Sequence, residues 1–276
     1  MLGNESAVAD YHIHPDFSID AAGSVDEYCQ AALDKGLVEI CFTTHYDSNP
    51  DGLETDRRMR IDGAVVPLSF EGVAKYREAV LKAREDYIGR GLEVKCGIEV
   101  GYYPGCEKHI SELFNRFPFD YKLVAIHEIN NICLCCQNRF ESCFSRFDLD
   151  AMADKYFGLA RDAVKSGLFD SIAHLDVYKK YGLKFYGENI LAIHRGRVES
   201  LFSAMSEYGV GMEMNTSSLR RGHTEYYPSM EIVNLARNLG VNINAIGSDA
   251  HKPEEVAYDF ETATAIAYEL FPYCDE

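Results

Sequence analysis

Two histidines two residues apart, His12 and His14, are the first residues of this chain whose type and spacing suit metal chemistry. They lie in a run that reads as a β-strand, where residues i and i+2 point to the same side, so both imidazoles should face one point. Neutral imidazole nitrogens bind metal ions readily, and Asp20 follows in the turn before the first predicted helix. A half-buried strand can carry two histidines by chance, so this pair alone does not define a metal site.

The later predicted strands end in the same kinds of residue. Together the strand ends carry His12, His14, His45, Glu99, His127, His174, Asp176, Glu213, Asp249 and His251. Six of the nine histidines in the chain belong to this set. The interior of a barrel prefers branched apolar residues, so stability does not require these side chains. Their recurrence at successive strand ends predicts a multinuclear metal centre.

Strands alternate with helices along the chain, which predicts parallel pairing. We expect seven strands, within residues 10–20, 38–45, 92–100, 121–129, 169–176, 209–215 and 241–251. We expect helices at about 24–36, 69–91, 107–117, 150–167, 188–208 and 228–240, and a last helix from Pro253. Residues 46–67 and 128–149 read as long irregular stretches. Closure of the sheet brings all strand ends together, so we predict a distorted seven-stranded TIM-like (β/α) barrel, with residues 1–276 as one domain.

Length and charge limit the class of protein. A chain of 276 residues suits one α/β barrel, and its net charge of −17 argues against binding the nucleic-acid backbone. There is no apolar run long enough to span a bilayer, so we expect no membrane partner. The first ten residues have neither a basic nor an apolar region typical of a secretory signal.

Nine cysteines, an odd number without a disulfide-like spacing, fit a reducing cytoplasm. Four of them, Cys133, Cys135, Cys136 and Cys143, lie close together in the chain and could form a thiolate metal site. Paired Cys-x-x-Cys motifs are missing from this stretch, so we favour buried or free thiols.

Imidazole and carboxylate ligands without cysteine favour Zn, Mn or Fe over Mg or Ca. The ligands exceed what one ion can hold, so we expect two or three divalent ions, with Glu99 as the bridging carboxylate. Metal ions a few ångströms apart generate hydroxide from water near neutral pH. They also hold both the attacking and the leaving oxygen of a displacement reaction. This chemistry suits phosphoester hydrolysis, and amide hydrolysis is the alternative.

These motifs resemble the PHP (polymerase and histidinol phosphatase) family of metal-dependent phosphoesterases. In chain order the resemblance rests on HIHPDFSID, FTTH, GIEVGY, IHE, AHLD, EMNTSSLR and GSDAH. It implies a trinuclear site in which one ion takes His12, His14, Glu99 and Asp249, a second takes Glu99, His127 and His174, and a third takes Asp20, His45 and His251. Asp20 and the NTSSLR motif resemble the histidinol-phosphatase branch, whereas residues 128–148 are unlike the family.

A phosphate substrate needs further cations. Arg220 has the fork geometry for two phosphate oxygens, and Lys179 and Lys180 follow the AHLD motif, although both lysines could lie in a solvated turn. We therefore expect Glu99, Asp176 and Arg220 to serve catalysis, with Arg220, Lys179 and Lys180 binding the substrate. The three arginines Arg57, Arg58 and Arg60 are interpreted as a solvated loop, with a lid as the alternative.

The most specific hypothesis is a phosphomonoesterase that acts on a small phosphorylated molecule, L-histidinol phosphate, in histidine biosynthesis. The nearest alternative is a PHP phosphoesterase for a nucleotide or another small phosphate. A non-catalytic metal-binding regulatory module that retains the ligands is an alternative of a different class.

Overall fold

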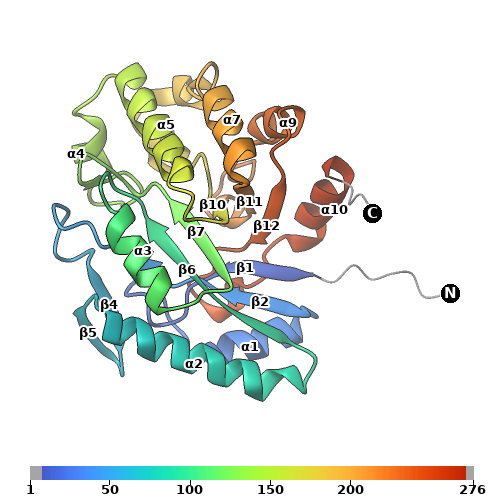
Figure 1. Cartoon of the computed structure of the whole chain (residues 1–276). Helices are drawn as coiled ribbons and strands as arrows, with labels where there is room; N and C mark the ends of the chain where they lie inside the picture. Colours follow the sequence, from blue (N-terminus) through green and yellow to red (C-terminus); the bar gives the residue numbers. More distant parts are fainter. Residues whose placement is uncertain (1–7, 272–276) are drawn as a thin grey trace.

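A computed structural model describes residues 8–271, and its centre is a parallel sheet that curves into a barrel (Figure 1). Seven strands follow in the order β1 (Ala9–Ile13), β2 (Glu39–Phe42), β6 (Glu93–Gly101), β7 (Tyr121–Ala125), β10 (Ser171–Ile172), β11 (Gly211–Asn215) and β12 (Ile243–Gly247). The short β3 (His45–Tyr46) pairs with β6 beside β2. A parallel bridge between Ile13 and Ala250 joins the two ends of the sheet. The predicted seven-stranded, nearly closed barrel is therefore confirmed.

Helices surround the barrel and bury their apolar sides against it (Figure 1). The longer ones are α1 (Val25–Asp34), α2 (Phe70–Ile88), α3 (Glu107–Arg116), α5 (Leu149–Lys165), α7 (Val198–Tyr208), α9 (Met230–Asn238) and α10 (Phe260–Leu270). In α2 the buried Val73, Tyr76 and Val80 recur every three or four residues, as helical periodicity requires. Buried Tyr76 also donates its hydroxyl proton to the Phe42 carbonyl at 2.7 Å, which ties the helix to β2.

Side-chain caps begin several of these helices at the predicted positions. Ser24 and Glu27 form a reciprocal capping box at α1, and Ser69 accepts a hydrogen bond from the Gly72 amide at α2. Such caps satisfy amides that have no partner within the helix, and each contributes about 1 kcal/mol.

The two stretches expected to be irregular contain regular elements. Residues 46–67 hold an antiparallel hairpin of β4 (Arg58–Ile61) and β5 (Ala64–Pro67), turned by Asp62 and Gly63 with positive φ. Residues 128–149 hold the hairpin of β8 (Glu128–Ile129) and β9 (Ile132–Cys133), followed by α4 (Phe140–Phe144). Thus Arg58 and Arg60 lie in a strand, and their interpretation as a solvated loop was wrong.

Three predicted helix boundaries were also wrong. The expected helix 188–208 is split into the 3-10 helix η1 (Gly187–Ala192) and α7, because Gly196 adopts φ 75° between them. The helix expected from Pro228 begins at Met230, after a cis Tyr227–Pro228 bond and the N-cap Ser229. Pro253 opens only η2 (Pro253–Glu255), and α10 begins at Phe260. Positive φ at Ala257 and Asp259 separates these two helices.

Two other short helices, α6 (Lys179–Tyr186) and α8 (Ser217–Arg220), follow β10 and β11 at the C-terminal end of the barrel. Among residues 8–271, no helix combines the length and the apolar character needed to cross a membrane.

Candidate metal centre

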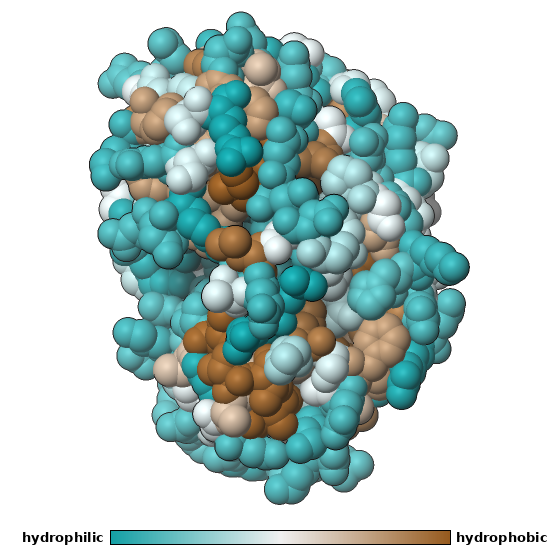
Figure 2. Space-filling model, turned by 90° about the vertical axis from the view of Figure 1, so that its left-hand side faces the viewer, coloured by the Kyte–Doolittle hydropathy of each residue, from teal (hydrophilic) through white to brown (hydrophobic). Residues whose placement is uncertain are grey.

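A cavity of about 450 Å³ opens at the C-terminal ends of the strands. Its lining includes the predicted ligands Asp20, His45, His127, His174, Asp249 and His251. The 46–67 segment and α4 lie on the left of Figure 1, and Figure 2 shows that side of the molecule face on. Hydrophilic residues cover most of this face, and hydrophobic residues form one larger patch in its lower half.

Glu99, fully buried on β6, lies at the centre of the predicted ligands. Its Oε1 is 2.9 Å from His174 Nε2, 3.4 Å from His127 Nε2 and 3.5 Å from His12 Nε2. Its Oε2 is 2.7 Å from His45 Nδ1 and 3.6 Å from His14 Nε2. One carboxylate thus faces five imidazoles, with a different set at each oxygen, which is the arrangement that a bridging ligand needs.

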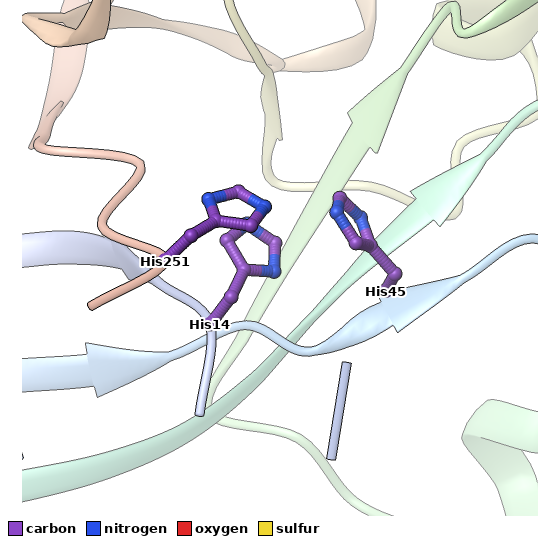
Figure 3. Close-up of side chains that lie close together, drawn as sticks. All are labelled: His14, His45 and His251. Carbon is purple, nitrogen blue, oxygen red and sulfur yellow. The ribbon is translucent and has the colours of Figure 1, made fainter. Parts of the chain in front are cut away.

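Two further carboxylates complete the cluster. Asp249 Oδ1 lies 3.4 Å from His14 Nε2 and 3.7 Å from His12 Nε2. Asp20 Oδ2 lies 3.4 Å from His251 Nε2 and 3.7 Å from His45 Nε2. Figure 3 shows His14 and His251 lying close together with His45 beside them. His14 directly follows β1, His251 lies in the segment after β12, and His45 lies on β3. The structure therefore brings all nine predicted ligands into one cluster.

The hydrogen bonding of these atoms shows that metal ions fit the cluster. His12 Nε2, His14 Nε2, His45 Nδ1 and Glu99 Oε2 are all buried, and none forms a hydrogen bond of acceptable geometry, although His45 Nδ1 and Glu99 Oε2 lie 2.7 Å apart. A buried polar atom without a partner costs about 1–3 kcal/mol, so four converging ones require an explanation. Coordination of divalent transition metals by these imidazole and carboxylate atoms supplies it.

At two of the predicted ligands, Glu99 and His14, electrostatics favour the protonation state that metal binding needs. At His12, His45 and His127, in contrast, the facing carboxylates outweigh burial and hold the imidazole pKa well above its usual value. Burial would raise the pKa of Glu99, but the facing imidazoles of His12, His45 and His127 hold the pKa of this carboxyl well below its usual range. Burial, assisted by neighbouring imidazoles, holds the pKa of His14 well below its usual value. An ionised carboxylate and a neutral imidazole are the forms that bind metal ions.

Two ligand residues have an unusual backbone conformation. His174 has φ 26° and Asp249 has φ 51°, a region that residues with a Cβ rarely occupy. Such strain of about 1–3 kcal/mol per residue persists where surrounding structure imposes it, and it gathers at functional sites.

Two further carboxylates contact the other ring nitrogen of predicted ligand histidines. Asp47 Oδ1 lies 3.0 Å from His127 Nδ1, and Glu213 Oε1 lies 2.7 Å from His12 Nδ1. Glu213 also accepts the backbone N–H of His174 at 2.8 Å. Such contacts fix the ring orientation and the tautomer of a ligand. The position of Glu213 at a strand end was visible in the sequence, whereas nothing in the sequence distinguished Asp47.

Arg60 was also missed, because its contacts are all to the backbone. Its guanidinium donates to the carbonyls of Asp16, Ser18, Ile19 and Ala21 at 2.7–3.1 Å. These residues surround Asp20, whose side chain is 57% exposed and is the most exposed carboxylate of the cluster. Arg60 therefore holds the segment that presents Asp20 to His45 and His251.

The predicted substrate-binding cations occupy different environments. Lys180 and Arg220 line the cavity, whereas Lys179 is buried against Asp176 and donates to Ser229 Oγ at 2.9 Å. Fully buried Asp176 also accepts the Ser229 amide and does not line the cavity. Arg220 donates to the carbonyls of Ser248 and Asp249 at 2.6 and 2.9 Å. It thereby fixes the backbone that carries the ligand Asp249.

Arg221 was not predicted and lines the cavity beside Lys180. Its Nη2 lies 3.8 Å from Asp249 Oδ2, and its side chain is 30% exposed. Burial lowers the pKa of Lys180, and the Arg221 cation lowers it further. Lys180 and Arg221 thus line the same cavity as the predicted metal ligands, where an anion can interact with both cations.

The cysteine-rich stretch contains a disulfide between Cys133 and Cys136, so the expectation of free thiols was wrong for this pair. The β8–β9 hairpin and the turn after it bring the two Cα atoms to 5.7 Å, within the usual range for a disulfide. The single Cys-x-x-Cys spacing formed by Cys133 and Cys136 was the available signal. Cys143 and Cys135 are free thiols, as expected, and Cys143 is buried.

The family model of the PHP domain matches residues 10–217, which is more than half of the chain. The chain belongs to the PHP family. This PHP protein is 30% identical over 258 residues to a protein of Deinococcus radiodurans named "Probable histidinol-phosphatase", with 94% of this chain and 92% of that one covered. It is 24% identical over 243 residues to the histidinol-phosphatase of Lactococcus lactis, covering 88% of this chain and 83% of that one.

The PHP protein also shares its fold with a solved structure. Histidinol phosphate phosphatase from Lactococcus lactis, crystallised with zinc, L-histidinol and phosphate, superposes with a TM-score of 0.77 at 19% identity. The superposition covers 97% of this chain and 95% of that chain. The PHP protein is thus a phosphoesterase of this family with a candidate polynuclear metal site.

Proposed function

We propose that this PHP protein is a metal-dependent phosphomonoesterase whose substrate is L-histidinol phosphate. The observation that carries the proposal is the composition of the cavity. One part of its wall holds the metal-ligand cluster, and another holds Lys180 and Arg221. The names of the similar proteins from Deinococcus radiodurans and Lactococcus lactis support this choice of substrate.

Nine residues would hold the metal ions: His12, His14, Asp20, His45, Glu99, His127, His174, Asp249 and His251. Bound divalent ions supply an activated water near neutral pH and neutralise charge on the phosphoryl oxygens. The chain's own contribution is to fix the ligands. Glu99 keeps the facing imidazoles in one cluster, and Asp47 and Glu213 hold the rings of His127 and His12.

Arg221 and Lys180 would bind the phosphate oxygens that face away from the metal ligands. Arg221 offers a planar fork, and Lys180 offers a point charge that the neighbouring Tyr181 ring helps to place, with Nζ 5.5 Å from the ring centroid. We assign Arg220 to the positioning of Asp249, because two of its nitrogens are bound to carbonyls. We assign Lys179 and Asp176 a structural role, because they form an ion pair and both hydrogen-bond to Ser229.

Glu128 is the candidate for recognition of the leaving group. L-histidinol carries an ammonium group at neutral pH, so its site needs an anion that is not neutralised by the protein. Glu128 lines the cavity and accepts a hydrogen bond from Asn49 Nδ2 at 2.7 Å. No cationic side chain within residues 8–271 forms an ion pair with it. Burial raises the pKa of Glu128, which a cationic ligand would offset by favouring the charged form.

Steady-state kinetics on a panel of phosphomonoesters test this proposal. The panel includes L-histidinol phosphate, a nucleoside monophosphate, a sugar phosphate and p-nitrophenyl phosphate, each with added Mn or Zn. We expect the highest kcat/KM for L-histidinol phosphate. A higher value for another member reassigns the substrate, and absence of turnover with the whole panel contradicts the phosphomonoesterase.

A further inference from the structure

The cysteine-rich segment forms part of the wall of the metal cavity. The hairpin of β8 and β9 follows directly after the ligand His127, and the Leu134 amide returns to donate to the His127 carbonyl at 2.9 Å. Cys133, Cys135 and Cys136 all line the cavity. Cys135 and Cys136 are half-buried and Cys133 is 3% exposed. Changes in the bonding of these sulfurs therefore occur in the cavity wall, beside the cluster of predicted metal ligands.

Three sulfur atoms lie close together here, and two of them are already bonded. Cys133 and Cys136 form the disulfide, and the free Cys135 Sγ lies 3.5 Å from Cys133 Sγ. Cys135 is half-buried, whereas the other free cysteines among residues 8–271 are buried: Cys29, Cys41, Cys96, Cys106 and Cys143. A free thiol next to a disulfide sulfur is the arrangement that thiol–disulfide exchange requires.

The contact with Arg139 makes Cys136 the better leaving sulfur when the disulfide is attacked. Arg139 Nη2 donates to Cys136 Sγ at 3.0 Å, and the same guanidinium pairs with both carboxylate oxygens of Asp56. A cation in contact with a sulfur stabilises the thiolate that leaves when a disulfide is attacked. Asp56 belongs to the 46–67 segment and also lines the cavity, so the ion pair links the cysteine segment to the 46–67 segment.

We propose that Cys133, Cys135 and Cys136 form a thiol–disulfide exchange site whose reaction partner is a small monothiol. The thiol RSH attacks Cys133 Sγ, the Cys133–Cys136 bond breaks, and Cys136 leaves with the electron pair and takes the proton of the thiol. Cys135 then attacks Cys133 Sγ, a Cys133–Cys135 bond forms, and RSH leaves with the proton of Cys135. The disulfide moves from Cys136 to Cys135, and nothing is oxidised or reduced overall.

Movement of the disulfide has a structural consequence at the entrance of the cavity. The bond to Cys133 no longer holds Cys136, so the Cys136 thiol is free to move away from Arg139, whose guanidinium then loses a contact that holds it beside Asp56. The link between Arg139 and the 46–67 segment is thereby weakened. Small thiols in solution thus affect how firmly the cavity entrance is held. This effect does not depend on which ester the enzyme hydrolyses.

Differential alkylation maps the bonds. The full-length protein is equilibrated in glutathione buffers, treated natively with N-ethylmaleimide, then denatured, reduced and treated with iodoacetamide. Cleavage after Lys122 and Arg139 places all three cysteines on one peptide, residues 123–139, and fragment ions assign each label. In oxidising buffer we expect maleimide on Cys135 and iodoacetamide labels on Cys133 and Cys136. Maleimide on all three in every buffer overturns the proposal.

Two variants test the exchange step. Cys136→Ser should form the Cys133–Cys135 disulfide in oxidising buffer, because those sulfurs are already adjacent. Cys135→Ser should hold more glutathione on Cys133 than the parent protein does, because only the return of Cys136 to Cys133 can then release it. Cys143→Ala, which removes a buried cysteine of the same segment, should match the parent protein. Free Cys133 and Cys135 in oxidised Cys136→Ser would contradict the proposal.

Hydrogen exchange provides a readout that does not depend on enzyme activity. Amides of residues 46–67 should exchange faster in oxidised Cys136→Ser, which carries the Cys133–Cys135 disulfide, than in the oxidised parent protein, while those of α2 stay unchanged. Identical exchange in the two proteins would show that the sulfur bonds do not affect the cavity entrance.

Discussion

Glu99 shows at the scale of single residues why a carboxylate occupies the centre of this site. Five imidazoles lie within 3.6 Å of its two oxygens, and they come from four strand ends, with His12 and His14 both at the end of β1. Each of these residues was recognisable in the sequence, because histidine and carboxylate at a strand end have no role in a barrel core. Asp47 and Arg221 were not recognisable, since an acidic or basic residue in a polar loop is usually solvated.

The first prediction concerns the phosphate-binding cations. Arg221→Ala and Lys180→Met should each lower kcat/KM about ten- to a hundredfold, since a charge-assisted hydrogen bond contributes about 1.5–3 kcal/mol. Metal content should stay at the parent level, because neither side chain belongs to the ligand cluster. Kinetics with L-histidinol phosphate, alongside metal analysis, check both statements. Unchanged kcat/KM in both variants would return Arg220 to the role of phosphate ligand.

A second prediction concerns Asp47, which orients His127. Asp47→Ala should weaken metal binding about 10- to 100-fold, the usual effect of removing a partner that holds a ligating imidazole. The comparison is Asp51→Ala, which removes an exposed carboxylate from the same loop. Competition with a chelator of known affinity measures the change, and equal metal affinity in the two variants would remove Asp47 from the site.

A third prediction concerns Glu128 and the leaving group. Glu128→Gln should raise KM for L-histidinol phosphate while leaving KM for p-nitrophenyl phosphate unchanged, because only the first substrate carries an ammonium group. The kinetics of one variant with two substrates provide the internal control. An equal rise in KM for both substrates would indicate a general disturbance of the cavity in place of recognition.

At the scale of elements, patterns local in the chain were predicted well, and features set by distant contacts were not. The capping residues Ser24 and Ser69 and the periodicity of α2 depend only on neighbouring residues, and the structure confirms them. The β4–β5 hairpin pairs with no strand of the barrel, so alternation of strands and helices gave no signal for it. The break before α7 depends on Gly196, which a helix can often accommodate.

The prediction at this scale concerns β4 and the segment that it holds. Arg60→Ala removes hydrogen bonds to four carbonyls around Asp20, the most exposed carboxylate of the cluster. We expect the metal ion bound by Asp20, His45 and His251 to bind about 10- to 100-fold more weakly, with the other ions retained. Lys75→Ala, which removes an exposed ion pair with Asp62 of the same hairpin, is the control.

Metal analysis after dialysis measures how many ions per chain Arg60→Ala and its control retain. Loss of one equivalent per chain from Arg60→Ala alone supports the assignment. Full metal content would show that the segment around Asp20 keeps its position without Arg60, and loss of every ion would show that the cluster binds as one unit.

At the scale of the whole molecule, the barrel explains how residues from His12 to His251 form one site. Parallel strands that close on themselves place all their C-terminal ends at one opening, so ligands spread along the chain converge there. The bridge from Ile13 to Ala250 completes this closure and brings Asp249 beside His12 and His14. The central claim is that this convergence produces a metal-dependent phosphomonoesterase.

One measurement tests that claim most directly. Phosphate release from L-histidinol phosphate is followed with one preparation before chelation, after chelation, and after Mn or Zn is added back. We predict two or three divalent ions per chain before chelation, loss of turnover when they are removed, and recovery when they are restored. Glu99→Gln should show no such recovery, because glutamine lacks the charge needed to bridge two cations. Full turnover by the metal-free protein, or full recovery in Glu99→Gln, would contradict the account.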